Sequence, residues 1–193
     1  MKQILFILAL AVCLFTACGP SGKKQVPAAE PADEKIVLEE EDAFDDVDES
    51  TEAISEKFID IALPGPDGDI LKASSYVNNN KLTLIDFWAS WCGPCRAEMP
   101  YVVKAYEAFH DQGFEIVGVS LDVEREAWLD AVNSLNMTWP QMSDLRGWEC
   151  EGAQTYNVQS IPANVLVDQE GNIVAANLRG DDLYNKVEEL LTR

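Results

Sequence analysis

The sequence predicts an α/β fold over residues 58–193, in which strands alternate with helices. The run Leu82–Ala89 is almost continuously apolar, which is typical of a central strand buried on both faces. A helical pattern over residues 93–112 follows directly, and Gly113 is placed to end it. The strand-like run Phe114–Leu121 comes next. This order favours a sheet whose strands are joined by right-handed crossovers.

A hairpin is expected before the central strand. Apolar and polar residues alternate over Lys57–Ala62, as they do in a half-buried strand. The segment Pro64–Gly68 is rich in turn-forming residues, so Ile70 and Leu71 are expected to pair back.

The C-terminal half completes the alternation. In order, it is expected to form a helix over Glu124–Leu135, a short helix over Trp148–Tyr156, strands over Asn164–Asp168 and Ile173–Leu178, and a last helix over Asp181–Thr192. Asp181 is expected to cap that last helix.

Composition narrows the function classes. The 193 residues are 47% hydrophobic, which is enough for one core and too few for two large domains. The chain has 34 acidic and 14 basic residues, so it lacks the basic footprint of a nucleic-acid-binding protein. Its one histidine, His110, disfavours a histidine-rich metal site.

The N-terminus reads as a targeting segment. Lys2 precedes an unbroken apolar run from Ile4 to Phe15, which suits a signal peptide and is too short to span a membrane. Small residues then precede Cys18, and this pattern resembles the lipobox of bacterial lipoproteins. We therefore expect a lipoprotein signal peptide over residues 1–17 and lipid on Cys18. An ordinary secretory signal is the alternative.

Residues 18–57 are expected to form a disordered acidic tether between the lipid and the domain. The stretch from Glu30 to Glu56 holds 13 acidic residues and a single base, Lys35. Such a segment cannot bury enough apolar surface to offset the entropy of folding. The alternative is an acidic docking segment for a basic partner.

The motif that carries chemistry is Trp91-Cys92-Gly93-Pro94-Cys95, where the buried strand meets the following helix. A cysteine at a helix N-terminus is favoured as thiolate by the free backbone N–H groups and the helix dipole. The second cysteine lies one helical turn on, within reach of the first. The alternatives are half of a zinc site, for which a second ligand pair is missing from the sequence, and a structural disulfide. The pattern favours a redox-active dithiol.

These residues carry a family resemblance. The segment LTLIDFWASWCGPCRAEMP is similar to the active-site strand and helix of thioredoxin-fold proteins, and more narrowly of the TlpA/ResA-like thiol–disulfide oxidoreductases. The similarity extends over FIDIALPGPDGDILKASSY, FEIVGVSLD and SIPANVLVDQEGNIV. It implies a thioredoxin fold, with a central mixed sheet flanked by helices, an N-terminal hairpin and a helix-containing insert near residues 124–157.

The resemblance implies roles for four catalytic residues. Cys92 is the attacking thiolate and Cys95 the resolving thiol. Asp86 lies inside the apolar strand, where burial raises a carboxyl pKa and suits it to exchange a proton with Cys95. Glu98 stays on the cysteine face of the helix, where the family has a functional glutamate. The alternatives are a solvent-facing acid for Asp86 and a solvated helix residue for Glu98.

The resemblance also implies a substrate-binding surface. Pro162 matches the family's cis-proline, which packs beside the disulfide and presents the backbone of the preceding residue, Ile161. Trp91, Gly93 and Pro94 complete the expected surface around the sulfur atoms. Ala163 stands where the family commonly has threonine, so that position receives no role.

The expected activity is reduction of disulfides in exported proteins by a membrane-anchored, periplasm-facing lipoprotein of the cell envelope. Gly-Pro between the cysteines is the thioredoxin dipeptide and favours a reducing pair. Apocytochrome c thiols before haem attachment are one class of target, and a membrane electron donor is needed because the sequence has no nucleotide-binding motif. We expect a monomer with no cofactor besides the redox-active disulfide and no metal.

Three alternatives stay open. A thiol peroxidase of the peroxiredoxin-related group would need a P-x-x-x-[TS]-x-x-C run around Cys92, which the sequence lacks. A disulfide-donating oxidase would use the same pair in the opposite direction. A tethered binding module would keep its function without either cysteine. Cys150 is expected to be a buried free thiol, with intermolecular pairing as the alternative.

Overall fold

A computed structural model describes residues 56–193. The expected signal peptide over residues 1–17, its lipidation site Cys18 and nearly all of the expected tether lie outside the described residues.

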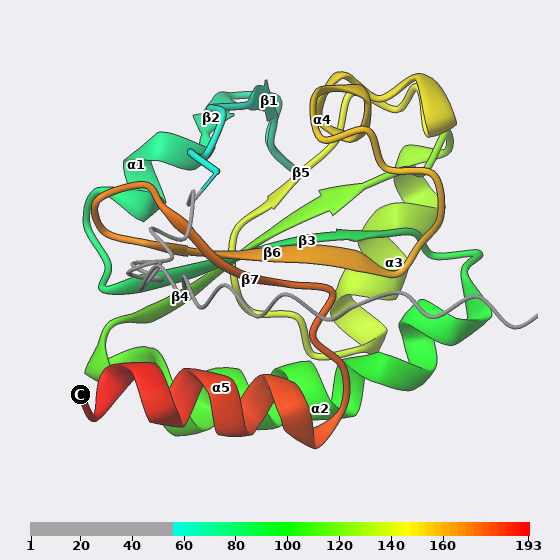
Figure 1. Ribbon diagram of the computed structural model, residues 1–193. Coiled ribbons are helices and arrows are strands. Elements are labelled where there is room, and N and C mark those ends of the chain that lie inside the picture. Colours follow the sequence, from blue (N-terminus) through cyan, green and yellow to red (C-terminus); the bar gives the residue numbers. More distant parts are fainter. Residues whose placement is uncertain (1–55) are drawn as a thin grey trace, which may run out of the picture. The chain divides into compact units, whose positions relative to one another are not determined.

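The described residues form a five-stranded mixed sheet and a separate two-stranded hairpin (Figure 1). The strands of the sheet are β3 (Leu82–Trp88), β4 (Phe114–Ser120), β5 (Gln141–Met142), β6 (Ala163–Asp168) and β7 (Ile173–Ala176). Their order is β5-β4-β3-β6-β7, with β3 parallel to β4 and antiparallel to β6. The predicted α/β class and mixed sheet are confirmed, and β3 takes the central place.

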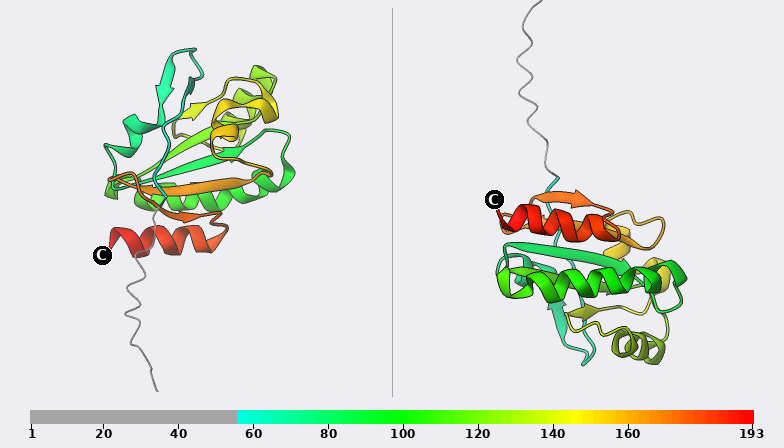
Figure 2. Two further views of the ribbon diagram at one scale, coloured as in Figure 1. Left: turned by 45° about the horizontal axis from the view of Figure 1, so that its top comes forward. Right: turned by 90° about the horizontal axis from the view of Figure 1, so that it is seen from below.

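Two helices cover one face of the sheet. Helix α2 (Gly93–Phe109) and helix α5 (Asp181–Leu191) lie side by side there (Figures 1 and 2). Towards the opposite side lie the hairpin of β1 (Ala62–Pro64) and β2 (Ile70–Lys72), helix α1 (Ala73–Val77) and helix α4 (Glu151–Thr155). Helix α3 (Arg125–Ser134) connects β4 to β5. The expected insert near residues 124–157 therefore contributes α3, β5 and α4.

The core runs through the two central strands. All seven residues of β3 are buried, as its apolar run predicted, and all seven residues of β4 are buried as well. Helix α2 buries Cys95, Met99 and Val102 on its sheet-facing side. The helix ends at Phe109 and passes into a 3-10 turn, and Gly113 then takes φ 102°, which favours glycine. The strand, the helix that follows it and its stop signal lie where the sequence predicted.

The predicted strand over Lys57–Ala62 is wrong, because β1 begins only at Ala62. The preceding backbone is extended but is held largely by other contacts. The backbone N–H of Ile59 donates to the Tyr156 hydroxyl (3.1 Å), and that hydroxyl donates to the Ile59 carbonyl (2.8 Å). The alternation of apolar and polar residues therefore belongs to an extended segment that is held by a few hydrogen bonds and is not a strand of the sheet.

Several boundaries also differ from the prediction. Asp181 is the first residue of α5 and not its cap, because Gly180 takes the cap position with φ 53°. The predicted helix over Trp148–Tyr156 is split, since Cys150 adopts φ −52° and ψ 126° between a 3-10 turn and α4. The last strand, β7, ends before Asn177, which adopts φ 54°. Two short elements, α1 and β5, were not anticipated.

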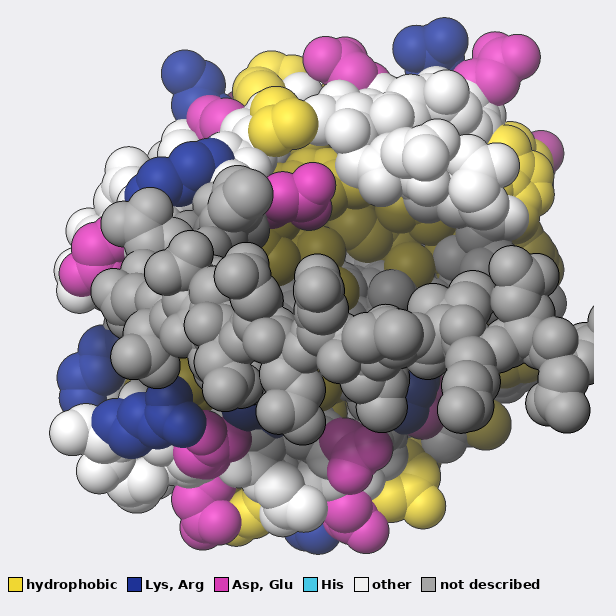
Figure 3. All heavy atoms as spheres, in the orientation of Figure 1, with side chains coloured by type: hydrophobic (Ala, Val, Ile, Leu, Met, Phe, Trp, Pro, Cys, Tyr) yellow, Lys and Arg dark blue, Asp and Glu magenta, His cyan; other side chains and the backbone are white. Residues whose placement is uncertain are grey.

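The surface of the domain is acidic. Residues 58–193 hold 21 acidic and 9 basic side chains, a net charge of −12. On the face drawn in Figure 3, acidic side chains are spread over the upper and lower parts of the domain instead of gathering in one patch. No helix within residues 56–193 is long and apolar enough to cross a membrane.

Candidate active site around the Cys92–Cys95 disulfide

The disulfide lies at the junction between β3 and α2. Cys92 is the cap residue of α2, and its Sγ accepts a hydrogen bond from the backbone N–H of Cys95 (3.1 Å). Pro94 occupies the first turn of the helix, where its missing N–H is not needed. Cys92 and Cys95 are bonded to each other. The local geometry therefore places one sulfur against the positive end of a helix, where a thiolate is stabilised.

The two sulfur atoms differ in access. Cys92 is 5% exposed and Cys95 is fully buried, while Trp91, Gly93 and Pro94 beside them are exposed. A second protein can therefore reach the pair only from the Cys92 side. This ordering fits Cys92 as the attacking atom and Cys95 as the resolving one.

Ile161 and Pro162, which we call the Pro162 loop, face the disulfide. The Ile161–Pro162 peptide bond is cis, as the resemblance predicted. The Sγ of Cys92 lies 3.8 Å from the carbonyl oxygen of Ile161. Both loop residues are half-buried, so part of their backbone is available to a bound chain. The structure brings together Cys92 and the loop, two parts of the site that are 69 residues apart.

Asp86 is a buried carboxylic acid in the central strand. It is 2% exposed, and its Oδ2 has no hydrogen-bond partner among the described residues. Burial raises the pKa of Asp86 to about 7, the Glu98 charge adds to the rise, and Arg179 and the Asn164 side chain oppose it. The expected burial is confirmed, and the alternative of a solvent-facing acid is wrong. A carboxyl group with this pKa can accept or give a proton near neutral pH.

Glu98 lies one turn after Cys95 on α2 and is half-buried. Its carboxylate accepts a hydrogen bond from the backbone N–H of Gly180, at the start of α5. Glu98 is therefore held between two helices and acts electrostatically on Asp86, unlike a freely solvated helix residue. Its functional role stays a prediction.

Two further residues lie at the site and were missed by the sequence analysis. Trp148 is 45% exposed and its ring centroid lies 6.2 Å from that of Trp91, which is 54% exposed. Arg179 donates to the carbonyl of Pro162 and to that of Leu178. Both residues lie far along the chain from the cysteine motif, and no local pattern marks either of them.

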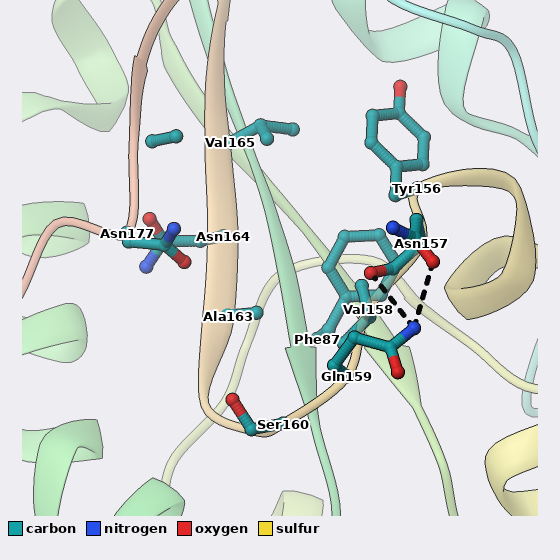
Figure 4. A pocket seen from close by; sticks show the side chains of 11 residues that line it. Phe87, Tyr156, Asn157, Val158, Gln159, Ser160, Ala163, Asn164, Val165 and Asn177 are labelled. Carbon is teal, nitrogen blue, oxygen red and sulfur yellow. Dashed lines mark hydrogen bonds between the residues drawn. The ribbon is translucent and has the colours of Figure 1, made fainter.

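A pocket of about 200 Å³ is lined by Ser160 and Ala163, which flank Ile161 and Pro162 in the chain (Figure 4). Phe87 and Val165 line it from neighbouring strands, and Tyr156 and Ser160 from the connecting segment. Neither cysteine lines the pocket. The chemistry is therefore carried by the exposed surface around Cys92 and not by this cavity.

Cys150 is free and fully buried, as expected, and burial raises the pKa of its thiol. A buried thiol of this kind is inert compared with one at a helix N-terminus. Within residues 56–193, no three His, Cys, Asp or Glu side chains gather as a metal site would require.

Comparison with known proteins shows which family and which relatives this chain is similar to. Residues 54–176 match the AhpC/TSA family. The chain is similar to the thiol-disulfide oxidoreductase ResA of Bacillus thuringiensis subsp. konkukian, with 29% identity over 113 residues that cover 58% of this chain and 63% of that protein. The match thus spans less than two thirds of this relative's length.

Solved structures extend the similarity to the fold. The thioredoxin domain of a thiol-disulfide oxidoreductase from Bacteroides vulgatus is 36% identical with a TM-score of 0.66, covering 71% of this chain and 96% of that one. A thiol-disulfide oxidoreductase from Bacteroides fragilis is 31% identical with a TM-score of 0.65, covering 70% and 99%. Residues 56–193 therefore have the thioredoxin fold that the sequence motifs predicted.

Proposed function

The chain belongs to the AhpC/TSA family and is TlpA/ResA-like in sequence and fold, and from this premise we propose that it is a thiol–disulfide oxidoreductase that reduces disulfides of exported proteins. The observation that carries this proposal is the Cys92–Cys95 disulfide at the start of α2, with the Cys92 sulfur beside the Ile161 carbonyl. The pair combines a thiolate-stabilising position with a neighbouring backbone that can align a second chain.

The first step uses the reduced pair. The Cys92 thiolate attacks one sulfur of the target disulfide, forms a mixed disulfide with it, and releases the other target sulfur as a thiolate. The N-terminus of α2 favours the Cys92 thiolate before the attack. The limited exposure of Cys92 requires the target disulfide to lie directly against Trp91, Pro94 and the Pro162 loop.

The second step resolves the mixed disulfide. The Cys95 thiol gives its proton to the Asp86 carboxylate, and the Cys95 thiolate then attacks the Cys92 sulfur. The Cys92–Cys95 bond forms, the mixed disulfide breaks, and the second target sulfur leaves as a thiolate. Two electrons have then passed from this protein to the target. A pKa of about 7 lets Asp86 take up this proton near neutral pH.

The dipeptide between the cysteines supports the proposed direction of electron flow, from this protein to its targets. Gly93-Pro94 is the dipeptide of thioredoxin, whose reduction potential lies near −270 mV and favours the reduction of targets. A membrane electron donor is then needed to restore the dithiol after each turnover. Exported proteins are the targets that a lipid-anchored, periplasm-facing domain would meet, and apocytochrome c is one class among them.

A lipid on Cys18 would anchor the domain to the membrane, and the acidic tether would let it search for targets. This proposal rests on the sequence pattern of residues 1–57. A stable anchor requires more than one acyl chain. Because the lipid is proposed to be on Cys18, metabolic labelling with a fatty acid should mark the wild-type chain and leave a Cys18→Ala variant unlabelled.

A thiol peroxidase is the second candidate, because the AhpC/TSA family match is consistent with it. The bonding of Cys92 to Cys95 across one helical turn and the missing peroxidase run favour the oxidoreductase. Hydrogen peroxide consumption by the reduced protein distinguishes the two. Rapid consumption that depends on Cys92, without insulin reduction, would favour the peroxidase.

The proposed exchange is tested with two cysteine variants. Cys92→Ser should abolish insulin-disulfide reduction, since it removes the attacking sulfur. Cys95→Ser should accumulate mixed disulfides with envelope proteins, because the resolving thiol is missing. Cys150→Ala is the matched control, and it should reduce insulin like the wild type because the Cys150 thiol is free and fully buried. Retained activity in Cys92→Ser would refute the mechanism.

A further inference from the structure

Arg179 lies in the short segment between β7 and α5 and is half-buried. One guanidinium nitrogen, Nη2, donates to the carbonyl oxygen of Pro162, and Nη1 donates to the carbonyl oxygen of Leu178 (2.6 Å). The planar guanidinium therefore ties its own segment to the loop that faces Cys92.

The residues on either side of Arg179 are also tied to the site. The Asn164 side chain accepts from the backbone N–H of Leu178 (2.9 Å) and donates to its carbonyl (3.0 Å). The backbone N–H of Gly180 donates to Glu98. Three consecutive residues thus contact β6, the Pro162 loop and α2, which are the elements that surround the disulfide.

Arg179 also carries the positive charge that acts on Asp86. The charged groups that act on Asp86 within the described chain are Arg179, with opposite sign, and Glu98, with the same sign. Asp181 on α5 is paired instead with Lys104 at 3.2 Å, and both of these side chains are exposed. Among the described residues, Arg179 is therefore the cation that acts on the Asp86 carboxylate.

We propose that Arg179 is a positioning residue for thiol–disulfide exchange: it fixes the Pro162 loop beside Cys92 and supplies the positive charge that acts on the Asp86 carboxylate. This inference rests on the function proposed above. The two roles, holding the loop and supplying the charge, can be separated. The pair of hydrogen bonds to Pro162 and Leu178 needs a guanidinium, whereas lysine also supplies the positive charge.

Two substitutions separate the parts. Arg179→Gln removes the charge, so the titration midpoint of Asp86, near pH 7 in the wild type, should move up by about one pH unit. Arg179→Lys keeps the charge and should hold that midpoint. Both variants lose the two guanidinium hydrogen bonds, of which the one to Pro162 holds the loop, so KM for insulin should rise about five- to tenfold, as expected for the loss of that one bond.

The experiment follows the Asp86 carboxyl carbon by NMR against pH in the oxidised full chain, with the signal assigned through Asp86→Asn. Lys186→Gln is the matched control, because it removes one positive charge from α5 at a position whose ion pair is with Glu189. Insulin reduction by the same variants provides KM. Circular dichroism checks that each variant is folded.

The outcomes distinguish this inference from the proposed function. A midpoint that moves in Arg179→Gln and stays in Arg179→Lys and Lys186→Gln, with KM raised in both Arg179 variants, supports it. An unmoved midpoint in Arg179→Gln, or an equal shift in Lys186→Gln, overturns the charge assignment, and an unchanged KM in both Arg179 variants overturns the loop assignment. A wild type that fails to reduce insulin refutes the proposed function, while the NMR titration still decides the charge assignment.

Discussion

Replacing Asp86 by Asn should stabilise the protein at alkaline pH. The pKa of Asp86 rises from 3.8 to about 7 on folding, chiefly because the carboxylate is buried. Between these two values the folded state keeps a proton that the unfolded state loses, so stability falls as pH rises. At about 1.4 kcal/mol per pH unit, the total loss is roughly 4 kcal/mol by pH 8. Asn is similar in shape, carries no charge and escapes this loss.

The assay is urea unfolding of the oxidised full chain at a series of pH values from 4 to 9, with the free energy of unfolding obtained by linear extrapolation. The two proteins should differ little at pH 4, and Asp86→Asn should be the more stable by up to roughly 4 kcal/mol at pH 8. Asp67→Asn, an exposed change in the β1–β2 turn, should stay within about 0.5 kcal/mol of the wild type throughout. Parallel stability curves for wild type and Asp86→Asn would refute the reasoning.

Three further changes test other parts of the site and core. Glu98→Gln removes a charge that raises the Asp86 pKa, so the acidic limb of the insulin-reduction pH profile should move to lower pH; a move to higher pH would contradict the assigned sign. Trp148→Ala should raise KM for insulin about fivefold by removing apolar contact beside Trp91, and leave a small aromatic disulfide unaffected. Val174→Ala, a change at an exposed position on β7, is the control and should leave KM unchanged for both insulin and the small disulfide. Gly118→Ala would drive a Cβ into the Gln141 amide and break its hydrogen bond with the Trp88 indole, costing about 1–3 kcal/mol in urea unfolding. An unchanged free energy of unfolding would show that Gln141 can move aside at little cost.

The central strand and the active-site helix could be predicted because their signals are local. An apolar run, a CxxC at its end and a glycine stop define β3 and α2 without reference to other segments. The N-terminal strand was misplaced because its backbone is held by Tyr156, almost a hundred residues away. The cap of α5 was misassigned because Gly180 takes a positive φ that the sequence pattern does not reveal.

In the candidate site too, residues with a local sequence signal could be predicted and residues placed by distant contacts could not. Cys92, Cys95 and Asp86 follow one another within ten residues, and their burial follows from the strand and helix that hold them. The cis peptide bond before Pro162 was predictable only from the family resemblance, because an X-Pro bond is more often trans. Arg179 and Trp148 could not be found, because each acts through contacts that only the folded chain creates. Their place at the site depends on contacts between distant parts of the chain more than on their residue type.

The reduction potential of the Cys92–Cys95 pair tests the central claim most directly. The full chain is equilibrated with a thiol buffer of defined potential, and the fraction of the pair in the disulfide form is measured by alkylation. Cys150→Ala removes the free thiol of the described residues from the measurement, and Cys13→Ala with Cys18→Ala removes the two that precede them in the chain. A value near that of thioredoxin, about −270 mV, is expected for a pair that reduces its targets. A value near about −120 mV, that of a strong periplasmic oxidant, would contradict the proposal and make the protein a donor of disulfides.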